Sequence, residues 1–309
     1  MAELDVHLAS DAEREAAHRN VYPQWPAAPT LEEHVRFRME SPRHSGASWF
    51  VGGLDGEVIC SLSSYPFGFR VRGEEFSGFG IGSVFTVPEH RGHGYAPRLM
   101  ARVEELSCAQ GRSMSILYSD LVPRYYERLG YVTCPASCGW RAVEKPSAVD
   151  PARLREFTGA EEIDRLAALY DADHGQRPMS VVRDRTNWAV AIAQFPQDRF
   201  FWLEEDGHSP WAYARVRAKD GALRIVDSAL APEARGDEEA FYTALLSQAR
   251  SAGLKRLGGW FIDSVVGRSF FDEETRSEEI PMVKLLASAG KLDAECMAAS
   301  AGFCELDHI

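Results

Sequence analysis

The sequence predicts an α/β (α+β) fold built from two similar units in tandem. The chain has 309 residues, about twice the length of a common single domain. Runs of strand-like residues alternate with helical stretches in both halves. The segment VPEHRGHGYA at residues 87–96 returns as APEARGDEEA at residues 231–240. We therefore expect an internal duplication, with a mixed sheet in each unit.

The first unit begins with strands and then becomes helical. Residues 48–67 read as two strands around a turn at 54–56, and residues 78–87 form a further strand. Leu99, Val103 and Leu106 follow at helical spacing, and Gly111 predicts the end of that helix. A short buried strand over 113–120 and a helix within 122–131, with Pro123 in its first turn and Gly130 just past its end, complete the unit.

The best linker lies at residues 144–153, which contain two prolines among polar residues. Placing the boundary near residue 147 gives domains 1–147 and 148–309. The second domain repeats the order of the first. We expect a helix over 159–175, three strands joined by turns at 206–207 and 220–221, and a helix over 237–254.

Composition excludes several classes of protein. The chain is 45% hydrophobic and 26% charged, with a formal net charge of −12, which argues against a nucleic-acid partner and is compatible with cationic ligands. We find no apolar run that could cross a membrane and no signal peptide, so a cytoplasmic protein is expected. Of the six cysteines only Cys134 and Cys138 are close in sequence, and we expect free thiols and no metal site.

The loop over residues 91–96 is suited to a phosphate group. It joins a strand to a helix, where unpaired backbone N–H groups and the helix dipole favour an anion. Gly92 and Gly94 carry no side chains that would block the ligand, and Arg91 adds positive charge. Pro97 fits the first helical turn. A flexible connection would be the alternative if this glycine pattern stood alone.

Two motifs together resemble the GNAT superfamily of N-acetyltransferases. The loop from Arg91 to Ala96 fits the R/Q-x-x-G-x-G/A signature, and YYERLGY at residues 125–131 is similar to the late helix of the superfamily. The wider match over about residues 48–135 looks most like fungal-type lysine N6-acetyltransferases. A weaker similarity connects the chain to acetyltransferases of the enhanced-intracellular-survival type. That second family normally has a third domain, for which the residues after the second unit leave little room.

The resemblance implies acetyl-CoA as cosubstrate and assigns its binding residues. Backbone on the splayed strand would polarise the thioester and hold the pantetheine arm, and the loop would hold the pyrophosphate. These cofactor-binding residues are Phe85, Thr86, Val87, Arg91, Gly92, His93, Gly94, Tyr95 and Ala96. Tyr126 stands at the general-acid position, with Tyr125 as the alternative if the register is shifted by one.

The general base is open from sequence. A lysine-like amine is mostly protonated at neutral pH, so a group must remove its proton before it attacks. Asp120, at the end of a predicted strand, is our first choice, while Glu89, His90 and the C-terminal carboxylate of Ile309 stay as alternatives.

We expect the acceptor to be a small-molecule primary amine, with free L-lysine first and protein lysines or aminoglycosides as alternatives. A non-catalytic acyl-CoA sensor is the alternative from another class. The motifs concern binding of the cofactor only, so they predict neither the acceptor amine nor the oligomeric state.

The second unit is expected to lack cofactor. Asp237, Glu238 and Glu239 stand where the first loop has His93, Gly94 and Tyr95, and these carboxylates would repel a pyrophosphate. We therefore predict a degenerate GNAT-like domain with an acceptor-site or structural role. Trp188, Trp202 and Trp211 are candidates for lining the acceptor pocket, or else belong to the core.

Overall fold

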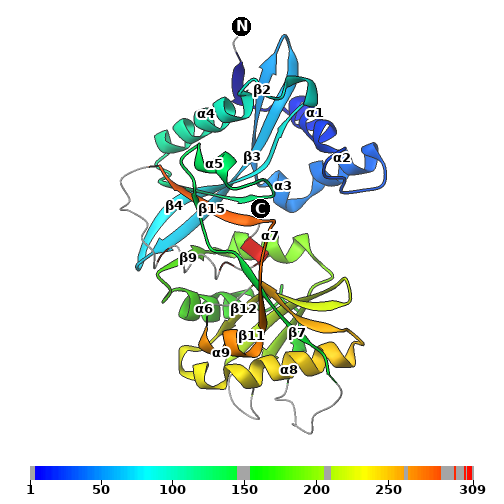
Figure 1. Ribbon diagram of the computed structural model, residues 1–309, viewed down its shortest axis with the longest axis vertical. Helices are drawn as coiled ribbons and strands as arrows, with labels where there is room; N and C mark the ends of the chain where they lie inside the picture. The colour runs from blue at the N-terminus through cyan, green and yellow to red at the C-terminus, as the bar shows by residue number, and fades with distance from the viewer. Residues whose placement is uncertain are drawn as a thin grey trace.

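The two halves of the molecule lie one above the other along its long axis (Figure 1). The computed structural model describes residues 4–144, 154–204, 210–260, 264–286, 296, 303 and 305–307. Within this part of the chain, an eight-stranded and a seven-stranded sheet form the centres of the two halves. Among the same residues, none of the helices has the length and apolarity needed to cross a bilayer.

The first sheet has the strand order β1-β2-β3-β4-β5-β15-β6, with β9 added alongside β3. Only the β4–β5 pair on this path is parallel. The elements of this half are β1 (Asp5–Leu8), α1 (Asp11–Val21), α2 (Leu31–Glu40), α3 (Pro42–Ser45), β2 (Ser48–Leu54), β3 (Glu57–Val71), β4 (Glu74–Thr86), η1 (Pro88–His90), α4 (Tyr95–Ala109), β5 (Met114–Ser119), α5 (Arg124–Glu127) and β6 (Val132–Thr133).

The second sheet follows the same plan. Its order is β8-β10-β11-β12-β13-β7-β14, and here only β12 and β13 are parallel. The remaining elements are β7 (Ser137–Ala142), β8 (Leu154–Phe157), α6 (Ile163–His174), β9 (Met179–Val182), α7 (Arg185–Gln194), β10 (Arg199–Leu203), β11 (Ala212–Lys219), β12 (Ala222–Leu230), η2 (Pro232–Asp237), α8 (Glu238–Ser251), β13 (Arg256–Trp260), α9 (Val265–Phe270), β14 (Asp272–Thr275), β15 (Ile280–Leu285) and η4 (Glu305–Asp307).

The two halves exchange a strand at equivalent places. β15, which is late in the chain, lies between β5 and β6 of the first sheet. β7, which precedes the linker, lies between β13 and β14 of the second sheet. Figure 1 shows both crossings, with the orange β15 in the upper half and the green β7 in the lower half. The domain boundary at residue 147 stays a proposal about the internal duplication. The two sheets do not follow this boundary, because β7 lies before it in the chain and belongs to the second sheet, while β15 lies after it and belongs to the first.

Most of the expected strands and helices are present. The turn at 54–56 has left-handed residues at Asp55 (φ 52°) and Gly56 (φ 84°), as a tight hairpin requires. The helix expected within 122–131 is only the single turn Arg124–Glu127, with Pro123 at its N-cap and the left-handed Gly130 (φ 88°) shortly after its end. Helices α1, α2, α3, α7 and α9 were not predicted from the sequence. The expected turn at 206–207 lies outside the described residues.

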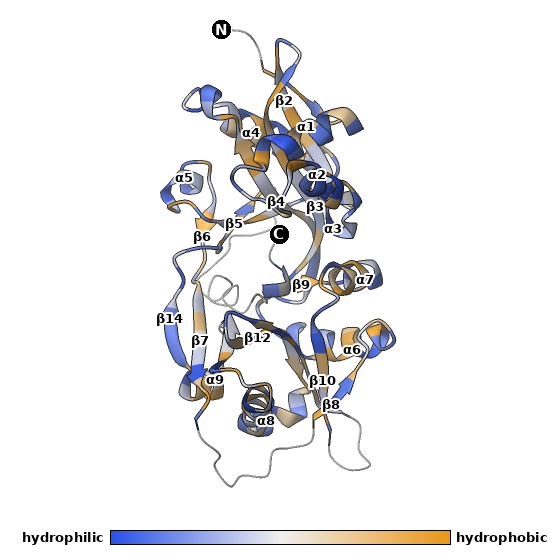
Figure 2. Ribbon diagram, turned by 90° about the vertical axis from the view of Figure 1, so that its right-hand side faces the viewer, coloured by the Kyte–Doolittle hydropathy of each residue, from blue (hydrophilic) through white to orange (hydrophobic). Residues whose placement is uncertain are grey.

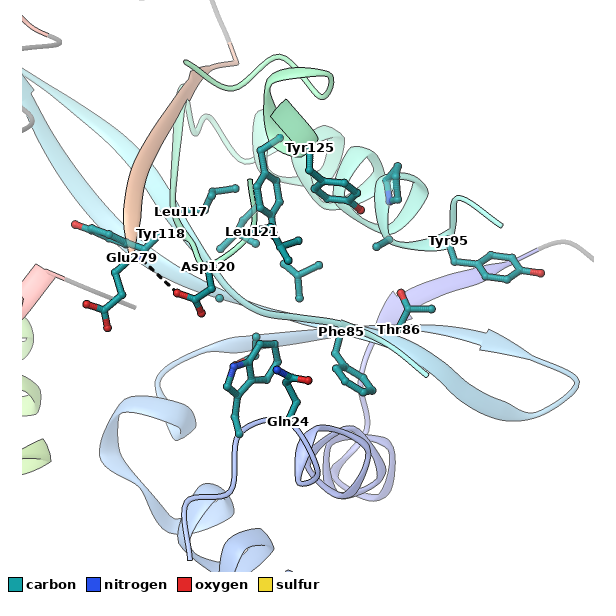
Figure 3. A pocket seen from close by; sticks show the side chains of 18 of the residues that line it. Gln24, Phe85, Thr86, Tyr95, Leu117, Tyr118, Asp120, Leu121, Tyr125 and Glu279 are labelled. Atoms are coloured by element: carbon teal, nitrogen blue, oxygen red, sulfur yellow. Dashed lines mark hydrogen bonds between the residues drawn. The ribbon is translucent and has the colours of Figure 1, made fainter. Parts of the chain in front are cut away.

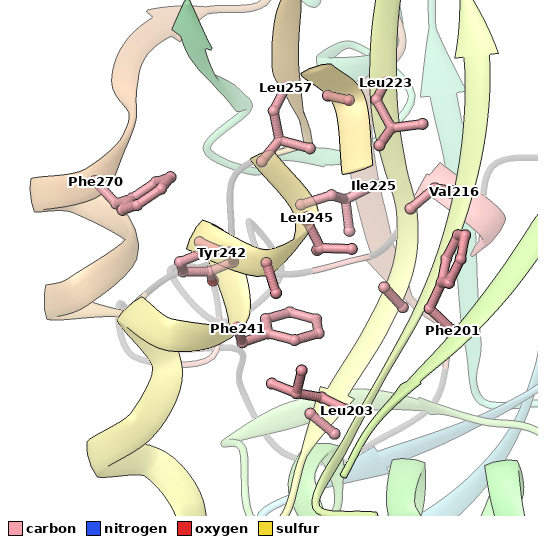
Figure 4. Close-up of a cluster of buried hydrophobic side chains, with 14 of the residues drawn as sticks. Phe201, Leu203, Val216, Leu223, Ile225, Phe241, Tyr242, Leu245, Leu257 and Phe270 are labelled. Carbon is pink, nitrogen blue, oxygen red and sulfur yellow. The ribbon is translucent and has the colours of Figure 1, made fainter. Parts of the chain in front are cut away.

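Each half has its own apolar core, where a helix packs on its sheet. In the first half, α4 places Leu99 and Val103 against the strands. In the second half, α8 covers the sheet with Phe241 and Leu245 (Figure 4). Figure 2 shows the apolar colouring along the strands of both sheets, with hydrophilic residues on the outer sides of the helices. Amphipathic helices on a sheet face produce this distribution.

Two of the candidate tryptophans belong to the core of the second half. Trp188 and Trp202 are fully buried in one cluster, and Trp211 packs against the neighbouring cluster. The core interpretation of these residues is therefore correct for Trp188 and Trp202. The tryptophan that lines the cleft described below is Trp25.

Candidate active site

A cleft opens in the first sheet where β4 and β5 diverge. The two strands pair in parallel only as far as Ile81 with Leu117. Just beyond, the pairing of β4 with β3 is also interrupted by an irregularity opposite residues 61–63, and Ser83 has a left-handed backbone with φ 51°. The cleft has a volume of about 1210 Å³ and contains residues from both diverging strands, the loop after β4, and helices α2 and α3.

The loop after β4 forms one end of the cleft. Gly92 has φ 81° and Gly94 has φ 75°, a region that disfavours other residues. No side chain caps the start of α4 at Gly94, and a Cβ atom at either glycine would meet no other atom within 4 Å. The first N–H groups of α4 thus have no capping side chain, and they lie at the positive end of a 15-residue helix. This geometry suits a phosphate group.

Arg91 connects the loop to the strand. Its Nε donates a hydrogen bond to the carbonyl oxygen of Thr86 at 3.0 Å, and its guanidinium lies 5.4 Å from the centre of the Phe85 ring. The Phe85 ring also makes an edge-to-face contact with Trp25, with ring centres 6.1 Å apart. These contacts hold the exposed side chain of Arg91 beside the cleft.

Most of the predicted cofactor residues come together at this end. Phe85, Thr86, Arg91, Gly92, Gly94, Tyr95 and Ala96 all line the cleft. Two predicted residues do not lie on its lining. Val87 donates its N–H to the carbonyl oxygen of Ile59 at 2.9 Å, and His93 is exposed with its ring stacked on Tyr95. Phe85 and Thr86 are therefore the backbone that faces the space between the strands.

Both candidate acid tyrosines line the cleft, on α5. Tyr126 is 8% exposed, and burial raises the pKa of its phenol. Tyr125 contacts it at a ring separation of 4.9 Å, and burial raises its pKa as well. A phenol with a raised pKa stays protonated at neutral pH and is able to donate a proton.

Asp120 also lines the cleft, directly after β5 (Figure 3). Its Oδ1 accepts a hydrogen bond from the backbone N–H of Glu279 at 3.3 Å. Of the alternative bases, His90 lines the cleft and Glu89 is not on its lining. Ile309 lies outside the described residues.

Two acidic residues in the cleft come from the second half of the chain. Glu278 and Glu279 lie just before β15 and reach the cleft because that strand joins the first sheet. Burial raises the pKa of Glu279, and the negative charges of Glu305 and Asp120 add to the effect. Sequence reasoning missed both residues, since no local pattern shows that residues 280–285 pair with β5.

Sequence reasoning also missed a cluster of basic residues on helices α2 and α3. Arg38, Arg43 and His44 line the cleft, and the ring of Tyr65 lies 5.5 Å from the Arg43 guanidinium. Arg38 is half-buried, and burial lowers its pKa. These helices were not expected from the sequence, so their side chains could not be placed.

The equivalent place in the second half is filled. Glu238 stands where the first loop has Gly94, and its side chain is only 5% exposed. Its Oε1 accepts hydrogen bonds from the hydroxyl groups of Tyr242 at 2.7 Å and Ser264 at 2.6 Å. Arg235, the counterpart of Arg91, forms an ion pair with Asp173. A buried carboxylate thus occupies the position that is open in the first half.

Comparisons with known proteins agree with the geometry. Residues 5–134 match the family model described as acetyltransferase (GNAT) domain. No curated protein sequence matches the chain.

Solved structures share the fold over 92% of this chain at low sequence identity. A conserved protein of unknown function from Enterococcus faecalis V583 has 16% identity and a TM-score of 0.74, with 72% of its own chain covered. A GCN5-related N-acetyltransferase from Anabaena variabilis has 17% identity and a TM-score of 0.72, with 73% covered. Eis1 from Mycobacterium abscessus has 17% identity and a TM-score of 0.62, with 74% covered.

The matched domain contains the divergent strands, the glycine loop and the tyrosines described above. Residues 5–134 therefore match an acetyltransferase domain of the GNAT type, and this match supports an acyl-CoA-dependent N-acetyltransferase activity.

Proposed function

We propose that the protein transfers the acetyl group of acetyl-CoA to the N6 amine of free L-lysine. The observation that supports this most is the cleft itself, which brings together the glycine loop, the end of β4 that no longer pairs with β5, and the tyrosines Tyr125 and Tyr126. The loop would hold the pyrophosphate, and the backbone of Phe85 and Thr86 would hold the pantetheine arm and the thioester. The acidic residues at the β5–β15 side fit a cationic acceptor.

In the proposed reaction the neutral amine attacks the thioester carbon directly in a ternary complex. A new C–N bond forms, the C–S bond breaks, and the electron pair of that bond stays on the sulfur of CoA. Tyr126 would give its proton to the departing sulfur, and the second proton, which the nitrogen loses as the amide forms, would return to the Tyr126 oxygen through water. Asp120, with Glu279 beside it, would accept the proton that the ammonium group must lose, directly or through water. Because the pKa of Glu279 is raised, it is a better proton acceptor than an ordinary carboxylate.

We propose that only the first half binds acetyl-CoA. In the second half the buried Glu238 occupies the place of Gly94, and a carboxylate there would repel a pyrophosphate. The second half would instead shape the acceptor side of the cleft, which agrees with the position of Glu279. Isothermal titration should give one equivalent of acetyl-CoA per chain, and two equivalents would contradict this assignment.

The function is tested by measuring release of free thiol from acetyl-CoA in the presence of different amines. Lysine, ornithine, spermidine, kanamycin and a histone-tail peptide form a suitable panel. We expect lysine to give the highest kcat/KM, with acetylation at N6 identified by mass spectrometry. A higher value for kanamycin or the peptide would replace lysine with that acceptor. If no amine released thiol above the rate of the buffer, the enzymatic assignment would be wrong.

A further inference from the structure

Basic side chains from helices α2 and α3 line one side of the cleft. The proposed function uses them neither to hold acetyl-CoA nor to hold the reacting amine. They include Arg38 on α2 and Arg43 on α3. The charge of Arg43 is close enough to contribute to the lowered pKa of Arg38, after the larger effect of burial. The partly buried charge of Arg38 is unfavourable unless an anion joins it.

Arg38 has no acidic partner within the part of the chain that the structure describes. Its Nη2 donates to the carbonyl oxygen of Trp25 at 3.3 Å, and its Nη1 lies 2.8 Å from Nε2 of His44. Its buried Nε has no hydrogen-bond partner among the described residues. Both of these partners are neutral acceptors, so none of the described residues neutralises the charge of Arg38.

A chain of hydrogen bonds holds the Arg38 guanidinium in one orientation. Burial, followed by the charge of Arg38, lowers the pKa of His44 to about 2, so its ring is neutral. Nε2 of His44 then accepts from Arg38, and its Nδ1 donates to Oγ of Ser41 at 3.1 Å. Ser41 in turn donates to Oε1 of Gln194 at 3.1 Å. Gln194 is on α7, so the second half of the chain supports this arginine.

An arginine held in this way is suited to a planar anion. The guanidinium offers five N–H donors in a rigid fork that matches a carboxylate, and only two of them have partners among the residues that the structure describes. The opposite charge lies in the same cleft, where Asp120, Glu278 and Glu279 come from the β5–β15 side. One cleft thus presents separate basic and acidic groups to its occupant.

We infer that the acceptor is a zwitterion whose carboxylate binds to Arg38, with Arg43 beside it, while its reacting amine lies toward Asp120 and Glu279. This inference rests on the proposed function and narrows the acceptor to a free amino acid with a side-chain amine. Polyamines and aminoglycosides have no carboxylate and leave the charge of Arg38 uncompensated. Ser41, His44 and Gln194 are positioning residues for that arginine.

The test compares acceptors that differ only at the carboxylate. Lysine, lysinamide and cadaverine present the same terminal amine, and only lysine has the carboxylate. One charge-assisted contact predicts that kcat/KM for lysine exceeds that for either analogue by about 10- to 100-fold. Equal values for the three acceptors would refute the carboxylate site and leave acetyl transfer intact, whereas no turnover of any amine would refute both proposals.

Variants of the protein test whether Arg38 causes the preference for an acceptor with a carboxylate. Arg38→Gln should lower kcat/KM for lysine by about the same 10- to 100-fold and change that for lysinamide by less than about twofold. Arg36→Gln is the matched control, because Arg36 is exposed on the same helix. Unchanged acetyl-CoA affinity shows that a variant is folded.

An equal loss for lysine and lysinamide in Arg38→Gln would overturn the assignment. Should that variant fail to fold, the wild-type ratio and the variant Arg43→Gln carry the test. Arg43→Gln is expected to reduce the preference for lysine over lysinamide. If this preference is not reduced, the result contradicts the assignment of the carboxylate to Arg38 and Arg43.

Discussion

The substitution Gly94→Glu would place a glutamate in the first half at the position that Glu238 occupies in the second half. Gly94 has φ 75°, so any side chain there costs about 1 to 2 kcal/mol of folding free energy through the backbone. A Cβ at this position meets nothing within 4 Å, so no clash is added. A carboxylate at the start of α4 interacts favourably with the helix dipole. Gly94→Glu should therefore be no less stable than the control Gly94→Ala.

The effect on cofactor binding should be much larger than the effect on stability. At a separation of about 5 Å and an effective dielectric constant of about 40, each pair of like charges costs about 1.7 kcal/mol. A pyrophosphate carries about two charges, so the total is about 3 kcal/mol, or about 150-fold in the dissociation constant. The cost should shrink in about 1 M salt, where the screening length falls to about 3 Å.

Isothermal titration of acetyl-CoA into both variants at low and high salt measures this difference, and denaturant unfolding measures their stability. Affinities of Gly94→Glu and Gly94→Ala that agree within about twofold would refute the placement of the pyrophosphate at this loop.

The remaining predictions concern the acid, the base and the strand exchange. Tyr126→Phe should lower kcat about 100-fold at unchanged acetyl-CoA affinity, and Tyr125→Phe should not; the reverse pattern in steady-state kinetics would move the acid to Tyr125. Burial raises the pKa of Glu279 above its unfolded value, so the wild type loses stability as pH rises through that pKa. The stability of Glu279→Gln relative to wild type should therefore increase between about pH 3 and pH 8, and a constant difference in denaturant unfolding would contradict this. Lys284→Met removes the 2.6 Å partner of the largely buried Glu104 and should cost about 2 to 3 kcal/mol, part of which Glu104→Gln should restore in the double variant.

The cofactor end of the cleft could be predicted because its determinants are local. A glycine with positive φ at the start of a helix and a tyrosine four residues before a second glycine leave a short, recognisable pattern in the sequence. Gly92, Gly94 and Tyr126 all line the cleft in the structure. His93 belongs to the same motif but points away, since a motif fixes the backbone of a loop better than the direction of each side chain.

The acceptor end could not be predicted because it is assembled from distant segments. Glu279 reaches the cleft only through the pairing of β15 with β5, about 160 residues earlier in the chain. Arg38 lies on a helix whose apolar face is weak, with only His34 and Val35 buried, so periodicity gave no signal for it. Both positions depend on tertiary packing, which outweighs local preference.

The exchanged strands imply that the catalytic half does not fold alone. In a fragment of residues 1–147, β5 would lose its antiparallel partner from Ser119 to Met114, and β6 would have no strand beside it. The exposed edge would include buried apolar residues such as Ile116 and Leu117, and an apolar edge strand favours aggregation. β7 would also be left without β13 and β14. We therefore expect the fragment to be insoluble, and to become soluble and to bind acetyl-CoA when residues 137–144 are removed and residues 276–286 are attached through a flexible linker. A soluble, acetyl-CoA-binding fragment 1–147 without that strand would refute the view that β15 completes the first sheet.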